Sequence, residues 1–120
     1  MGKINILADK IYSIVRQAQE LALAAIKPGK TCGEIDSLAR GYIEDNGYGG
    51  CFGHGLGHGV GLEVHEEPHI GKKQNIKLQP GMVFTVEPAI YLPRKFGIRL
   101  EDMVLVTKKG SEVLSVSLNK

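Results

Sequence analysis

The first part of the chain has the hydrophobic period of two helices. From Leu7 to Ile26, apolar residues recur three and four positions apart, and Pro28-Gly29 ends the pattern. Thr31 and Glu34 have the spacing of a capping box, which predicts a second helix that Asn46-Gly47 ends. The short connection predicts an antiparallel pair. The expected core positions are Ile11, Ile14, Val15, Ala18, Leu21, Ala22 and Ala25, then Ile35, Leu38, Ala39, Tyr42 and Ile43.

After Gly47 the helical period disappears and the pattern becomes that of strands. Alternating apolar residues predict a strand at Val60, Leu62 and Val64. Further strand-like segments are Met82–Tyr91, Ile98–Val106 and Glu112–Val116. Helices followed by antiparallel strands are typical of the α+β class. At 120 residues, we expect one domain covering residues 1–120.

The overall composition excludes some classes of partner but does not identify a function. The formal net charge is +2 and the basic residues are scattered, so nothing predicts a nucleic-acid partner. No apolar run approaches the length of a membrane span, so we expect no membrane partner either. Two cysteines outside CxxC spacing predict no disulfide framework, and we expect a cytoplasmic location. Cys51 is a metal-ligand candidate by position, although a small buried thiol is the simpler interpretation.

All four histidines lie in one glycine-rich segment, FGHGLGHGVGLEVHEEPH, at positions 52–69. Glycine lets a backbone pass close to another strand or to a ligand. Histidines in such a segment are poor core residues, which favours a functional role over a structural one at His54, His58 and His65. For His69, which follows Pro68, we favour the structural role.

Two familiar motifs are excluded in this segment. Residues His65–His69 match HExxH, but that zinc motif requires a helix, and Pro68 opposes one. The alternating glycines do not match GxGxxG and no helix follows them, so a dinucleotide site is excluded as well.

Two carboxylates stand within apolar, strand-like sequence. Glu87 lies in TVEP and Glu101 lies in GIRLED. A carboxylate is costly to bury unless it is paired or binds a metal. Strand alternation places Thr85 on the face of Glu87, and Arg99 on the face of Glu101. The alternative is that both glutamates point into solvent from the open face of a sheet.

Three segments in order, HGLGHGVGLEVHEEP, LQPGMVFTVEPAIY and GIRLEDMVLV, resemble the Xaa-Pro aminopeptidase, prolidase, methionine aminopeptidase and creatinase family. The helical segments AQELALAAIKPG and IDSLAR extend the resemblance to the whole chain. It implies half of a pita-bread fold, namely two antiparallel helices packed on a curved antiparallel sheet. The matching part is the second of two pseudo-symmetric halves.

The resemblance also implies roles for particular residues. His58, Glu87 and Glu101 match metal ligands, of which Glu101 bridges two metals. His54 and His65 match histidines that contact substrate or the reacting carbonyl, and Glu87 or a neighbouring carboxylate would accept the proton of the attacking water. Thr85 and Arg99 would support the ligands by hydrogen bonds. The ion would be Mn, Co, Zn or Fe, with up to two ions if another chain completes the site.

One departure from the family is large. Two aspartates complete its dinuclear site, and Asp9, Asp36 and Asp45 match neither. We therefore expect metal-dependent hydrolysis of amino-terminal or Xaa-Pro peptide bonds that is weak in this chain alone. The expected partners are a peptide and either a second copy of the chain or a separately encoded first half. The alternatives are a non-catalytic module that binds peptides or proteins, and a fragment that needs its partner half.

Overall fold

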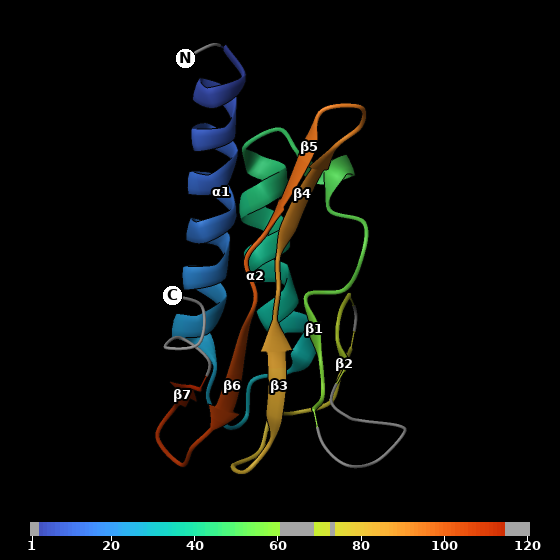
Figure 1. Ribbon diagram of the computed structural model, residues 1–120. Helices are drawn as coiled ribbons and strands as arrows, with labels where there is room; N and C mark the ends of the chain where they lie inside the picture. Colours follow the sequence, from blue (N-terminus) through green and yellow to red (C-terminus); the bar gives the residue numbers. More distant parts are fainter. Residues whose placement is uncertain (1–2, 61–68, 73, 115–120) are drawn as a thin grey trace.

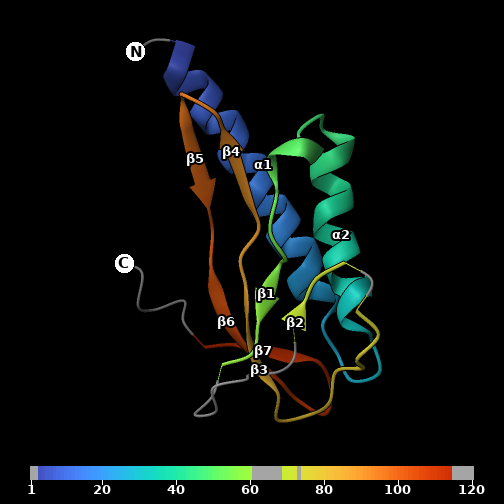
Figure 2. The same ribbon diagram turned by 90° about the vertical axis from the view of Figure 1, so that its right-hand side faces the viewer.

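The computed structural model describes residues 3–60, 69–72 and 74–114, and it consists of a helix layer against a layer of antiparallel strands (Figures 1 and 2). Helix α1 (Lys3–Ala25) runs antiparallel to helix α2 (Cys32–Asp45). The α+β class and the antiparallel helix pair are thereby confirmed. In the described part of the chain, neither helix is both long enough and apolar enough to cross a membrane.

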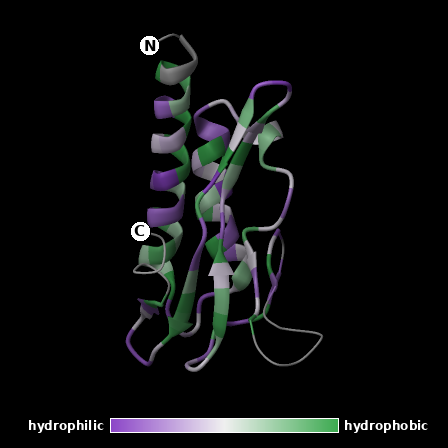
Figure 3. Cartoon of the chain, in the orientation of Figure 1, coloured by the Kyte–Doolittle hydropathy of each residue, from purple (hydrophilic) through white to green (hydrophobic). Residues whose placement is uncertain are grey.

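The expected hydrophobic stripes form the core between the two layers. Figure 3 shows hydrophilic residues on the outer side of α1, away from α2. Two expected core positions differ from the expectation, because Leu38 is 42% exposed and Leu21 is only half-buried. Fully buried side chains from both layers meet in the core, among them Ile11, Val15, Ile35, Ile43, Phe84 and Ile90.

The predicted capping box begins α2. The Thr31 amide donates to Glu34 Oε1 at 2.8 Å, and the Glu34 amide donates to Thr31 Oγ1 at 3.1 Å. The bond from the Thr31 backbone holds the pKa of Glu34 below its ordinary value. Helix α1 begins at Lys3, four residues before the apolar pattern starts at Leu7.

The described strands form three small antiparallel sheets. One pairs β1 (Gly57–His58) with β2 (His69–Ile70), a second has the order β3 (Val83–Val86), β6 (Asp102–Val106) and β7 (Ser111–Val113), and the third is the far end of a long hairpin. An isolated bridge between Gly59 and Phe84 places β1 beside β3 and so joins the histidine segment to the hairpin. Of the strand predicted around Val60, positions 62 and 64 lie outside the described residues.

Each of the two longest predicted strands is interrupted once. Met82–Tyr91 was expected to be continuous, but it divides into β3 and β4 (Ala89–Leu92). Ile98–Val106 likewise divides into β5 (Phe96–Arg99) and β6. Pro88 has no amide proton for a ladder, and the Glu87 amide donates instead to Leu56 O at 2.7 Å. The interruptions at 87–88 and 100–101 face each other across the hairpin.

The close approach of β1 to β3 requires a glycine. A Cβ atom built on Gly57 would lie 1.7 Å from Thr85 O, so any side chain there would push the strands apart. This contact fixes the position of His58, the next residue, relative to the start of the hairpin interruption.

Candidate functional site

His58 and Glu87 are brought together by the contact between β1 and β3. His58 Nε2 lies 3.4 Å from Glu87 Oε2. The Glu87 side chain is 13% exposed, whereas that of His58 is 59% exposed. The pair therefore has a well-buried carboxylate and an imidazole that remains accessible from outside.

The hydrogen bonds of His58 determine what this pair can bind. His58 Nδ1 lies 3.0 Å from Gly59 O, and a carbonyl can only accept, so Nδ1 carries the proton. In the neutral ring, Nε2 then directs a lone pair towards an ionised carboxylate oxygen. Two acceptors at this distance are stabilised by a cation between them, either a proton or a metal ion. Two ligands about 2.0–2.1 Å from a tetrahedral ion would be about 3.3–3.4 Å apart, so the spacing fits a metal.

Thr85 connects these two residues by a short hydrogen-bond chain. The His58 amide donates to Thr85 Oγ1 at 3.1 Å, and this hydroxyl donates to Glu87 Oε2 at 2.7 Å. Because the hydroxyl hydrogen points at Glu87, the Thr85 oxygen is free to accept from His58. Thr85 is 4% exposed, so this orientation of the carboxylate is protected from water.

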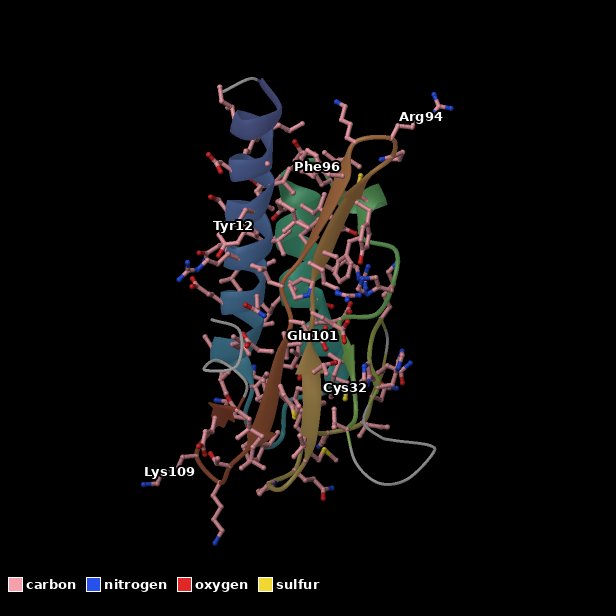
Figure 4. All side chains as sticks on the ribbon, viewed as in Figure 1. Tyr12, Cys32, Arg94, Phe96, Glu101 and Lys109 are labelled. Atoms are coloured by element: carbon pink, nitrogen blue, oxygen red, sulfur yellow. The ribbon has the colours of Figure 1, made fainter. Side chains whose placement is uncertain are left out.

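Glu101 and Arg99 lie at the facing interruption and are held less firmly. Arg99 Nη1 is 3.9 Å from Glu87 Oε1, and Arg99 Nε is 3.9 Å from Glu101 Oε1. Figure 4 shows Glu101 midway along the hairpin. It lines a hollow of about 700 Å³ beside α1, whereas Arg99 lines both this hollow and the pocket of His58. Among the described residues, no three His, Cys, Asp or Glu side chains are grouped closely enough to hold a metal ion.

His54 presents a second imidazole to the same pocket. Its Nδ1 lies 2.6 Å from Gly55 O, which again identifies Nδ1 as the protonated nitrogen. Its Nε2 is the one buried side-chain nitrogen or oxygen in the described ranges that lacks a hydrogen-bond partner. The ring contacts Phe52 edge-on, with centroids 5.1 Å apart. An acceptor nitrogen is thus held at the pocket without a hydrogen-bond partner among the described residues.

A buried ion pair on α2 holds the loop that carries His54. Arg40 makes two bonds to Asp36, at 2.8 and 3.0 Å, and the two side chains are 9% and 1% exposed. Arg40 also donates to the carbonyls of Phe52 and His54, while Asp36 Oδ1 accepts from the Leu56 amide. The backbone on both sides of His54 is therefore attached to one helix.

The two imidazoles and Glu87 line one pocket of about 250 Å³. Its walls are His54, Gly55, Gly57, His58, His69, Glu87 and Arg99. His69, for which the sequence favours a structural role, is the register partner of His58 in the β1–β2 pair and also lines this pocket. His65 lies outside the described residues. Cys51 is half-buried in a short 3-10 helix (Gly49–Cys51), and its sulfur is a free thiol.

The sequence and the fold identify the relatives of this chain. The profile of metallopeptidase family M24 matches residues 1–108. This chain belongs to metallopeptidase family M24. An Xaa-Pro dipeptidase of Pyrococcus horikoshii is 49% identical over 115 residues, which is 96% of this chain and 33% of that relative. The Xaa-Pro dipeptidase of Pyrococcus furiosus matches to the same extent. The chain thus spans about a third of the length of the curated relatives it matches.

Solved structures of M24 enzymes confirm the pita-bread architecture. The prolidase of Pyrococcus horikoshii superposes with a TM-score of 0.85 and 50% identity, over 88% of this chain and 30% of that one. The methionine aminopeptidase of Rickettsia prowazekii superposes with a TM-score of 0.76, over 90% of this chain and 52% of that one. At 24% identity the second likeness shows the fold alone. This chain therefore corresponds to about half of the length of that aminopeptidase.

Proposed function

We propose that this chain forms part of a metal-dependent peptidase centre that hydrolyses Xaa-Pro or amino-terminal peptide bonds. The proposal rests on the His58–Glu87 pair, in which His58 Nε2 and Glu87 Oε2 are 3.4 Å apart and the imidazole is accessible from outside. Membership of family M24 and the likeness to Xaa-Pro dipeptidases support the reaction class.

In this proposal, His58 and Glu87 bind one divalent ion and Glu101 supplies a further carboxylate. His58 and Glu87 fit such an ion by donor type and spacing. Glu101 has a side chain that is 47% exposed and paired only at 3.9 Å, so it has room to turn towards an ion. Mn, Co, Zn and Fe all suit one histidine with carboxylates. The bound metal would polarise the peptide carbonyl and acidify a water.

The remaining roles are proton transfer and substrate binding. Glu87, fixed by Thr85, accepts the proton of the attacking water. His54 Nε2 accepts a hydrogen bond from the peptide, because its tautomer leaves that nitrogen unprotonated. Thr85 holds Glu87 in place, Arg99 lies 3.9 Å from each carboxylate and balances their charge, and His65 stabilises the oxyanion.

We propose that activity is weak in this chain alone and rises with a partner. No aspartate of this chain joins His58 and Glu87 in the described structure, so a second ion would be poorly held. The partner is a second copy of the chain or a separately encoded first half of the domain. A cytoplasmic setting belongs to this proposal, supported by Cys32 and Cys51, which form no disulfide in the described part of the chain.

Metal binding tests the centre directly. We expect Mn²⁺ to raise the unfolding temperature of the wild-type chain and to bind with one ion per chain in calorimetry. Glu87→Gln should abolish this binding, and Glu101→Gln should weaken it. Glu112→Gln is the matched control, because Glu112 is exposed in β7 and lies outside the candidate pocket. A wild-type chain that neither binds nor is stabilised by Mn²⁺, Co²⁺ or Zn²⁺ would refute the metal centre.

Peptidase assays and light scattering test the reaction and the assembly. We expect feeble hydrolysis of Xaa-Pro dipeptides by the metal-loaded chain, lost in Glu101→Gln. Turnover that is insensitive to this change would identify a contaminating enzyme. Metal binding without any turnover, in monomer and assembly alike, would favour the peptide-binding module. A monomer at micromolar concentration in light scattering would exclude a stable homodimer and leave the separately encoded half.

A further inference from the structure

A single polar side chain interrupts the apolar stripe of α1. Gln19 stands four residues after Val15 and three before Ala22, both fully buried, and it is itself only 7% exposed. A primary amide is costly to bury unless its hydrogen bonds are made. We therefore expect the Gln19 amide to form hydrogen bonds with the strands that α1 covers.

The partners of Gln19 are the two carbonyls that precede the two carboxylates of the candidate centre. Gln19 Nε2 donates to Val86 O at 3.3 Å and to Leu100 O at 3.2 Å. Val86 is followed by Glu87, and Leu100 is followed by Glu101. One amide group thus attaches α1 to both hairpin interruptions, each at the residue before a glutamate.

The chemistry of this contact is specific to glutamine. Both partners are carbonyl oxygens, which only accept, so the amide nitrogen is the part of the side chain that must face them. Its two hydrogens match two acceptors. An ionised glutamate of the same length has no donor, and asparagine is one methylene shorter and cannot reach both strands.

We propose that Gln19 is a positioning residue that holds the backbone of Glu87 and Glu101 at a fixed separation. The inference rests on the proposed function in assigning the two carboxylates to one centre. Gln19 touches neither carboxylate and acts through the carbonyl next to each. Its loss should let the interruptions move relative to each other, while the helix layer and the strands on either side stay folded.

Gln19→Met is the test variant, because methionine has the same length, favours helices and has no donor. Val15→Ala is the matched control, since it weakens the core on the same helix without removing a hydrogen bond to the interruptions. Amide hydrogen exchange of the 120-residue chain is measured by NMR at Glu87 and Leu100, with Phe84 and Val104 as references. We expect exchange about tenfold faster at Glu87 and Leu100 in Gln19→Met, beyond any change at the references. Val15→Ala should accelerate all four amides alike.

The second measurement is Mn²⁺ affinity by calorimetry. We expect the Kd for Mn²⁺ to rise about tenfold in Gln19→Met and to stay at the wild-type value in Val15→Ala. Equal Kd values in the two variants would show a merely structural role and overturn the proposal. If Gln19→Met does not fold, Gln19→Asn takes its place, with the same expectations.

The two proposals fail in distinguishable ways. A wild-type chain that binds no Mn²⁺ refutes the metal centre, and hydrogen exchange then decides alone whether Gln19 fixes the interruptions. In that case, uniform acceleration in Gln19→Met would overturn the positioning role. Local acceleration at Glu87 and Leu100 would uphold it.

Discussion

Glu87 and Glu101 occupy matching interruptions of one hairpin, and each follows a carbonyl bound by Gln19. Their side chains nevertheless differ. Glu87 is 13% exposed and accepts a 2.7 Å bond from Thr85, whereas Glu101 is 47% exposed and has Arg99 at 3.9 Å. The difference shows that a fixed backbone does not by itself order a carboxylate. Glu87 is ordered because β1 lies against its strand and brings in Thr85 and His58, while Glu101 has no such neighbour among the described strands.

The largest effect is expected from separating β1 from β3. Gly57→Ala places a Cβ atom 1.7 Å from Thr85 O, so the strands must shift, and we expect a loss of about 3 kcal/mol in unfolding free energy. Gly53→Ala is the control, because a Cβ atom there meets nothing within 4 Å. Urea unfolding measures both. Equal stabilities of the two variants would mean that the β1 contact is not what distinguishes Glu87 from Glu101.

An intermediate effect is expected from removing the hydroxyl of Thr85. Thr85→Val removes the hydroxyl that accepts from the His58 amide and donates to Glu87, which should cost about 1–3 kcal/mol in unfolding free energy. Thr85→Ser keeps the hydroxyl and should lose only about 1 kcal/mol, for the missing methyl group. Thermal and urea unfolding provide the comparison. A valine variant as stable as the serine variant would contradict the anchoring of Glu87.

The smallest effect is expected at Arg99. Its side chain is 50% exposed and both its ion pairs measure 3.9 Å, so Arg99→Met should change the unfolding free energy by less than about 0.5 kcal/mol. Raising the salt concentration should leave this difference nearly unchanged, because so little of it is electrostatic. A loss above about 1.5 kcal/mol would show that Arg99 orders Glu101 and would remove the contrast between the two glutamates.

The local parts of the fold were predictable from the sequence. The helical stripes and the Thr31–Glu34 capping box depend on residues three and four apart, and the structure confirms them except at Leu21 and Leu38. The first interruption had a local sign in Pro88, whereas the second, at Leu100–Glu101, has none of its own. Its place depends on the strand across the hairpin and on an amide from α1, which no local pattern reveals.

Strand alternation and motif likeness predicted part of the candidate site. The contacts by which the helices hold the site residues in place were not predicted. The contact of Thr85 with Glu87 follows from alternation, and the structure shows it. The Asp36–Arg40 pair was missed, although two charged residues four apart on an apolar stripe are a sign of a buried network. The position of His69 beside His58 results from strand pairing, which the sequence around His69 does not reveal.

The contacts of Gln19 also have a consequence for the order in which the chain acquires its structure. They join residues 67 and 81 positions apart. At a synthesis rate of about 5–20 residues per second, the second carbonyl leaves the ribosome about 4–16 s after the glutamine that binds it. The buried amide of α1 therefore stays unmatched while the following 81 residues are synthesised. The two glutamates can be held together only after residue 100 has emerged, when the helix pair has already had time to form.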